Sequence, residues 1–206
     1  MTKYHSQEPF LITMPQGVSP QVFLIKPGSI QRDSSGRILD ARSSVALIVS
    51  KEKKIVVDTG LAGEDKLILD ALRHLGFKPV EIDIVINTHS HNDHCGNNQL
   101  FHRARILAPA DGELIVPGVW AMKTPGHSLD SISVVVEGPR TVVIAGDALP
   151  TFSNFIKNVP PFMHVDRELA VSSMAKIISI ADIVVPGHDL PFSVRERSFT
   201  KQQIDE

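Results

Sequence analysis

The sequence predicts an α/β protein in which two β-sheets pack together with helices on the outside. Each half of the chain is rich in short apolar runs and contains one segment with helical periodicity, and each half finishes on a buried run that presents polar residues at its end. Two sheets covered by helices bury such runs best. With 206 residues and neither a linker nor an internal repeat, we expect one domain over residues 1–206.

The first half begins with a polar lead, and its sequence pattern then predicts strands followed by a helix. PQVFLIKPGSI and RSSVALIVS are typical of strands, and SIQRDSSGRILDARS between them predicts a hairpin connection or an exposed flap. KKIVVDTG predicts a third strand over residues 55–57. GEDKLILDALRHLGFKP has the helical period. Its predicted apolar side consists of Leu67, Leu69, Ala71, Leu72 and Leu75.

The second half follows the same plan. ARILAP, GELIVPG and VWAMKTPG predict short strands, and SISVVVEG with RTVVIAGDA predicts a strand pair. DRELAVSSMAKIISIAD predicts the second helix, and IVVPGH the last buried strand. The tail SVRERSFTKQQIDE is polar, and we expect it to be helical or frayed.

Composition limits the setting in which the protein works. The chain is 42% hydrophobic and 21% charged, as in ordinary globular proteins, and a net charge of -2 gives no general attraction to nucleic acid. KEKK at residues 51–54 is the only dense basic cluster, and a solvated turn explains it. The opening MTKYHSQEPF lacks a signal-peptide core, and no apolar run could cross a bilayer. With a single cysteine, this predicts a cytoplasmic protein without a membrane partner.

A histidine-rich loop carries the strongest functional signal. THSHNDHCGN, residues 88–97, follows the apolar run DIVI and places His89, His91, Asp93 and His94 within six positions. His89 and His91 are two apart in an extended segment and can face one ion, whereas Asp93 and His94 lie past the turn and face another direction. The loop therefore predicts ligands for two metal ions. Cys95 beside it is more typical of a small packing residue than of a ligand.

Three more ligand-type residues stand alone at predicted strand ends. They are His127 in TPGHS, Asp147 in AGDA and His188 in PGHD. Each is a weak signal by itself, but together with the loop they complete a set of five histidines and two aspartates. Asp58 in VDTG also ends a strand, where it serves either turn chemistry or the orientation of a metal-bound histidine.

The segment TFSNFIKNVPPFMHVD, after Asp147, predicts a border of the cleft. Its apolar residues Phe152, Phe155, Phe162 and Met163 cannot all point inward from so irregular a stretch. Apolar walls with a few polar groups are usual in small-molecule pockets. His164 would then act on a leaving group, or else the loop simply packs on its own domain.

The order VDTG, HSHNDH, GH, GD, GH resembles the signature of the metallo-β-lactamase-fold hydrolase superfamily over nearly the whole chain. The resemblance implies a four-layer αβ/βα sandwich with two metal ions in the cleft between its sheets. It implies that His89, His91 and His127 hold the first ion, that Asp93, His94 and His188 hold the second, and that Asp147 bridges them. The complete set resembles the glyoxalase II, ribonuclease Z and lactonase side of the superfamily. TVVIAGDA and ADIVVPGHDLPFSV further resemble the family of metallo-β-lactamase-domain-containing protein 1, a small single-domain branch.

The ligand types predict the chemistry. Imidazole and carboxylate ligands suit two zinc ions, with manganese or iron as alternatives. Two ions hold a hydroxide between them and polarise the substrate, and Asp93 is the candidate catalytic residue that carries its proton. We expect hydrolysis of a small ester, thioester or lactone. The alternatives are a phosphodiesterase or ribonuclease acting on single-stranded RNA or small phosphodiesters, and a mononuclear iron protein like the persulfide dioxygenases.

The lack of room for the substrate-binding additions of larger relatives predicts a small substrate. Glyoxalase II has a C-terminal helical extension and ribonuclease Z has an RNA-clamping arm, whereas this chain ends 18 residues after His188 and has no room for either. A small-molecule partner is therefore expected, nucleic acid is possible although the charge does not indicate it, and an oligomer is possible.

Overall fold

Two β-sheets form the centre of the protein in the computed structural model, which describes residues 8–12 and 20–200. The polar lead and the last six residues of the tail lie outside these ranges. In spatial order, the first sheet contains β1 (Phe10–Leu11), β2 (Gln21–Lys26), β5 (Val45–Val49), β6 (Lys54–Val57), β7 (Ile84–Ile86) and β8 (Arg105–Leu107). The second contains β15 (Ser198–Phe199), β14 (Phe192–Ser193), β13 (Ile183–Pro186), β12 (Val142–Gly146), β11 (Ile132–Val136), β10 (Val119–Lys123) and β9 (Leu114–Val116).

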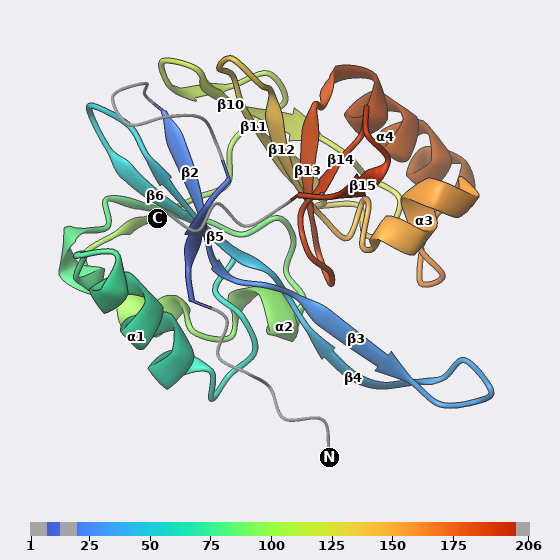
Figure 1. Cartoon of the computed structure of the whole chain (residues 1–206), viewed down its shortest axis with the longest axis horizontal. Coiled ribbons are helices and arrows are strands. Elements are labelled where there is room, and N and C mark those ends of the chain that lie inside the picture. Colours follow the sequence, from blue (N-terminus) through green and yellow to red (C-terminus); the bar gives the residue numbers. More distant parts are fainter. Residues whose placement is uncertain (1–7, 13–19, 201–206) are drawn as a thin grey trace.

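The sheets pack face to face because their strands are apolar on both faces. Side chains alternate along a strand, so Val134 and Val136 of β11 pack between the two sheets, whereas Val135 faces the helices. Figure 1 shows α1 (Asp65–His74) outside the first sheet and α3 (Phe152–Lys157) with α4 (Arg167–Ile180) outside the second. The predicted four-layer αβ/βα sandwich is confirmed.

The buried side of α1 differs from the predicted one. Ile68, Ala71 and Leu72 are buried, whereas Leu67 is 47% exposed. A helix buries residues at spacings of three and four, and starting from Ile68 this spacing selects Ala71 and Leu72 but leaves out Leu67 and Leu69. The prediction counted every leucine and omitted the isoleucine that begins the stripe.

Helix α4 begins as its sequence predicts. The side chain of Asp166 accepts a hydrogen bond from the Leu169 backbone N–H at 3.0 Å, which satisfies one of the free amides of the first turn. Met174 and Ile177 are buried against the second sheet, and Ala170 is buried against Gly126 in the loop after β10. Among the described helices, none combines the length and hydrophobicity needed to span a bilayer.

The predicted flap is a two-stranded hairpin of β3 (Ser29–Arg32) and β4 (Ile38–Arg42), which extends away from both sheets in Figure 1. Its base is tied to the second sheet, since the Ser44 backbone N–H donates to the Gly187 carbonyl at 2.7 Å. Gly28 is required at this base because a Cβ there would lie 2.3 Å from the Gly187 oxygen.

The tail prediction was wrong for the described residues. Residues 192–199 form β14 and β15, which extend the second sheet. Phe192 is fully buried and pairs with Val184 of β13, so burial of one aromatic side chain outweighs the polar character of its neighbours. The remaining short helices are α2 (Asn92–Cys95), η1 (Pro79–Glu81) and η2 (Asn98–Phe101).

Both sheets contain a parallel strand pair at the place where ligand-type residues follow. β6 pairs with β7, and β12 pairs with β13, each in parallel register. The carboxyl ends of parallel strands meet at one edge of a sheet, where open α/β sheets usually bind ligands. Loops that are distant in sequence therefore converge at that edge.

Candidate metal centre

All seven predicted ligands meet at this edge, and they come from four separate segments of the chain. His89 and His91 follow β7, and Asp93 and His94 lie in α2. The three others follow β10, β12 and β13, respectively. The ligand-type atoms form three groups whose members lie within 4.8 Å of one another: His89, His91 and His127; His89, His94 and Asp147; Asp93, His94 and His188.

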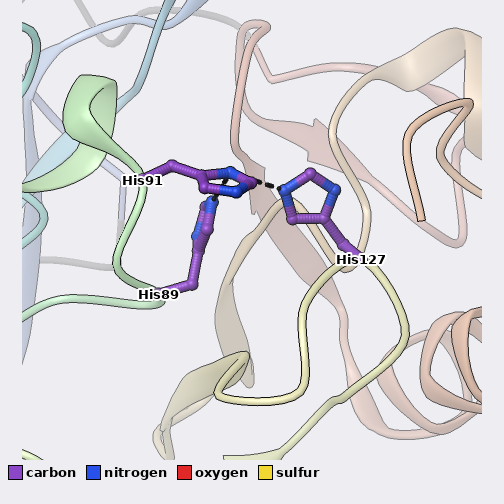
Figure 2. Close-up of side chains that lie close together, drawn as sticks. All are labelled: His89, His91 and His127. Carbon is purple, nitrogen blue, oxygen red and sulfur yellow. Dashed lines mark hydrogen bonds between the residues drawn. The ribbon is translucent and has the colours of Figure 1, made fainter. Parts of the chain in front are cut away.

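The first group has the spacing of ligands around one ion. His91 Nδ1 lies 3.0 Å from His89 Nε2 and 3.0 Å from His127 Nε2, and Figure 2 shows the three rings turning nitrogen atoms toward one another. Metal–nitrogen bonds of about 2.0–2.1 Å in tetrahedral geometry put ligand nitrogens roughly 3.3 Å apart. Three imidazoles on these backbones therefore fit a transition-metal ion with small adjustments.

The second group lies around Asp93. Its Oδ2 atom is 3.5 Å from His188 Nε2 and 3.8 Å from His94 Nε2. His94 is fully buried and His188 nearly so, whereas the Asp93 side chain retains 19% of its exposure. Solvent therefore reaches this group on the side where the Asp93 carboxylate lies.

Asp147 lies between the two groups. Its Oδ2 is 3.4 Å from His127 Nε2, and its Oδ1 is 3.1 Å from His188 Nε2 and 3.4 Å from His94 Nε2. His94 Nε2 and Asp147 Oδ1 are buried and have no hydrogen-bond partner of adequate geometry. Buried polar atoms are normally satisfied, and a cation between these two atoms would satisfy both. The donor set therefore fits bound metal.

Backbone carbonyls fix two of the imidazole rings. His127 Nδ1 lies 2.8 Å from the Met163 oxygen, and His188 Nδ1 lies 3.0 Å from the Arg42 oxygen. A carbonyl only accepts, so each Nδ1 must carry the hydrogen and donate. The Nε2 lone pair of each ring is then directed at the ligand cluster, as metal-binding histidines require.

Asp58 orients a third ring, in the position that the second of its two predicted roles requires. Its Oδ2 is 2.8 Å from His94 Nδ1, and its Oδ1 accepts the Thr88 backbone N–H at 2.7 Å. The Thr88 hydroxyl donates to Oδ2 at 2.9 Å. Asp58 has a positive φ of 58°, a conformation that Asp and Asn tolerate better than other residues with a Cβ. The loop conformation and the histidine contact thus both depend on this aspartate.

We expect Asp58→Asn to weaken zinc binding by about 10- to 100-fold, the usual effect of losing a group that orients a ligand. Asparagine keeps the size and the left-handed backbone but removes the charge that faces His94 Nδ1. Competition with a chromogenic chelator measures the affinity. An affinity equal to that of the wild type would mean that the fold alone holds His94 in place.

Burial and neighbouring charges shift the pKa values of several residues in the cluster. Burial, and then the neighbouring charge of His94, lower the pKa of His89 to about 2, so His89 is neutral and ready to bind metal. Burial by itself would raise the pKa of Asp147, but His188 and His94 hold it well below the usual range. Burial likewise opposes charge on His94, yet Asp58 and Asp147 raise its pKa well above the ordinary value. Metal binding must displace that proton.

A cavity of about 370 Å³ opens beside the cluster. Its polar side contains Asn92 and five of the predicted ligands: His91, Asp93, His127, Asp147 and His188. Its apolar side comes from the β3–β4 hairpin and from residues 150 and 161–163. The residues concerned are Ile30, Ile38, Ala41, Pro150, Pro161, Phe162 and Met163.

The loop after Asp147 borders this cavity, as the sequence predicts. Phe162 and Met163 line the cavity and are 79% and 54% exposed. Phe155 is buried instead, and Phe152 packs with it against Phe192. Part of the loop is not irregular, because Thr151 caps α3 by accepting a hydrogen bond from the Asn154 backbone N–H.

Two other polar residues lie away from the cluster. His164 does not line the cavity, and its Nδ1 donates to the Pro161 carbonyl at 2.8 Å. Cys95 belongs to none of the three ligand groups among the described residues, and its thiol lies 3.3 Å from the His91 carbonyl. Cys95 therefore contacts backbone rather than the predicted metal ligands.

Sequence reasoning missed the backbone carbonyl groups that orient ligand histidines. The carbonyls of Arg42 and Met163 hold two ligand histidines from positions 146 and 36 residues away. Every residue has a carbonyl, so residue type gives no signal for this role. Arg32, at the rim of the cavity, was also missed because it lies in the flap.

Similarity to known proteins agrees with this geometry. Residues 40–117 match the family profile of the metallo-beta-lactamase superfamily. The chain is 33% identical to metallo-beta-lactamase domain-containing protein 1 of Rattus norvegicus, over 87% of this chain and 82% of that protein. The chain belongs to the metallo-β-lactamase superfamily. As a member, it is a metal-dependent hydrolase.

Other members of the superfamily share the fold. The chain is 26% identical to an N-acyl homoserine lactonase of a Bacillus species, over 75% of this chain and 84% of that protein. The AiiA protein of Bacillus thuringiensis, solved as a variant with N-decanoyl-L-homoserine at its active site, superposes with a TM-score of 0.66 at 24% identity. That superposition covers 82% of this chain and 92% of AiiA. The αβ/βα sandwich is therefore common to these metallo-β-lactamase relatives.

Proposed function

We propose that this protein is a dinuclear zinc hydrolase that acts on a small ester, thioester or lactone. The observation that carries the proposal is the position of Asp147, whose carboxylate lies 3.4 Å from His127 of one ligand group and 3.1–3.4 Å from His188 and His94 of the other. A carboxylate placed in this way is suited to join two ions. His89, His91 and His127 would hold one ion, and Asp93, His94 and His188 would hold the other.

Two such ions supply Lewis acidity and activate water near neutral pH. The residues of the chain position the reactants around them. Asp93 Oδ2 lies 3.5 Å from His188 Nε2, and Asp93 also lines the cavity, so its carboxylate is placed to accept a proton from a reacting water there. The same carboxylate can return that proton to the leaving group. His89 and His94 are buried and do not line the cavity, so they would exclude water from that side of the centre.

The shape and charge of the surroundings support a small carbonyl substrate. The cavity beside the ligands is largely apolar, and Arg32 is the only lysine or arginine among its described lining residues. The basic cluster at residues 51–54 lies at the start of β6, whereas Asp58 of the site follows the other end of that strand. Four strand residues span about 13 Å, so the length of β6 separates the basic cluster from the site. A nucleic-acid backbone is usually held by several phosphate contacts, and the cavity offers one cation.

The lactonase relatives support the same substrate class. Their names give N-acyl homoserine lactones as substrates, which are cyclic esters with an acyl arm. An apolar wall facing a cluster of metal ligands is suited to such an arm. The chain would bind a small molecule and no membrane surface.

We expect the zinc-loaded protein to hydrolyse a thioester or a lactone with kcat/KM at least about tenfold above that for a simple phosphodiester or a short single-stranded RNA. One purified sample, assayed with all four compounds, makes the comparison, and Asp147→Ala reports contaminating activity. Metal-dependent RNA cleavage with higher efficiency would overturn the carbonyl assignment. Oxygen consumption with a persulfide by the iron-loaded protein would instead indicate a dioxygenase.

A further inference from the structure

Large apolar side chains line the cavity on the side that does not carry the metal ligands, and the hydrolytic reaction itself does not require them. Ile30 and Ile38 of the hairpin face the cavity from one side, and Phe162 and Met163 approach from the loop before α4. Phe162 is 79% exposed. Large apolar side chains clustered around a cavity with this exposure are typical of a binding surface. They would bind an apolar part of a substrate.

Arg32 lies on this same side and is held at two points. Its guanidinium carbon lies 5.8 Å from the centre of the Phe162 ring, and its Nη1 donates to the Gly36 carbonyl at 2.9 Å. The ring contact links the hairpin to the loop across the cavity. Arginine stacked on an aromatic face keeps its N–H groups free at the edge of the plane. These two contacts orient the guanidinium without neutralising it.

No carboxylate neutralises Arg32 within residues 8–12 and 20–200. No acidic oxygen there lies within 4.0 Å of its guanidinium, whereas Arg42 on the next strand contacts both Asp40 and Glu64. Asp33, the adjacent residue in sequence, uses its Oδ1 to accept hydrogen bonds from Ser35 and from the Arg37 backbone. A cation that lines a largely apolar cavity without an acidic partner is suited to bind an anionic group of a ligand.

We propose that the cavity selects acyl substrates whose apolar arm ends in a carboxylate. The reacting carbonyl lies at the Asp147 cluster, the arm lies between Ile38 and Phe162, and the terminal carboxylate pairs with Arg32. The inference rests on the proposed hydrolysis of carbonyl compounds. A carboxylate suits the guanidinium because its two oxygens match the planar pair of N–H donors.

Two phenyl esters of equal chain length test the proposal: phenyl hexanoate, which is neutral, and the monophenyl ester of adipic acid, which ends in a carboxylate. We expect the zinc-loaded wild type to prefer the adipate ester by about tenfold in kcat/KM, mostly through KM, as for one charge-assisted contact in a partly exposed site. Arg32→Gln should remove the preference, so that the two esters are hydrolysed with equal kcat/KM. Arg32→Lys should keep part of the preference.

Arg37→Gln is the matched control, because Arg37 is exposed in the turn of the same hairpin and does not line the cavity. It makes the same change in charge and should keep the full preference. Equal kcat/KM for the two esters in the wild type, or an equal loss of preference in both arginine variants, would overturn the proposal.

Binding without turnover separates this proposal from the proposed function. Calorimetric titration of the zinc-loaded protein with adipate and with hexanoate should show about tenfold tighter binding of adipate, and Arg32→Gln should abolish the difference. If neither ester is hydrolysed while adipate still binds more tightly through Arg32, the proposed hydrolysis of carbonyl esters fails and the carboxylate site stands. If hexanoate and adipate bind equally well, the carboxylate site fails whatever the hydrolytic activity.

Discussion

Asp147→Ala is expected to lower kcat/KM by about a thousandfold or more, which corresponds to roughly 4 kcal/mol of lost transition-state stabilisation. Its oxygens face His127 on one side and His94 and His188 on the other, so the substitution removes a ligand from both groups at once. Zinc analysis after dialysis should fall from two ions per chain to fewer than one. Elemental analysis and initial rates on the same sample measure both effects.

Two further variants are compared with Asp147→Ala: one is a control, and the other removes a ligand of a single group. Asp70→Ala removes an exposed carboxylate of α1 that pairs with Arg73, and it should retain two zinc ions and full activity. His127→Ala removes a member of one group and should chiefly lose the first ion. One zinc ion per chain at saturation in the wild type would contradict the bridging role of Asp147.

Gly126→Ala is expected to destabilise the protein by about 3 kcal/mol or more. A Cβ at residue 126 would lie 2.2 Å from the backbone nitrogen and 2.4 Å from the Cα of Ala170 in α4. Neither atom belongs to a flexible side chain, so the helix or the loop must move. The residue also has φ +134°, which side chains with a Cβ rarely adopt. Overpacking and backbone strain each contribute about 1–3 kcal/mol. Urea unfolding measures the change.

Gly112→Ala separates the two causes. Gly112 has φ +72° and no atom within 4 Å of the added Cβ, so it should lose only about 1 kcal/mol from backbone strain. Gly126→Ala should also weaken zinc binding, because the next residue is the ligand His127. Equal destabilisation by the two alanines would mean that contact with Ala170 has no energetic role.

The sequence alone predicted most of the fold, since its strands follow from local apolar runs and its two main helices from segments with helical periodicity. Errors arose where burial depends on distant packing. Leu67 and Ile68 are equally apolar neighbours, but only Ile68 faces the sheet. The described start of the tail became strands because Phe192, directly before it, packs beside β13 and brings Ser193 into the sheet, and no local pattern indicates that packing.

Residue type and position along the chain determined the candidate ligands of this protein, because few side chains bind transition metals and these occurred at strand ends. Only the tertiary structure decided what surrounds them: that carbonyls of Arg42 and Met163 orient two rings, and that Arg32 faces the same cavity. The physical reason is that these contacts join segments brought together by sheet packing. Their geometry depends on backbone atoms, which all residues share and which sequence cannot distinguish.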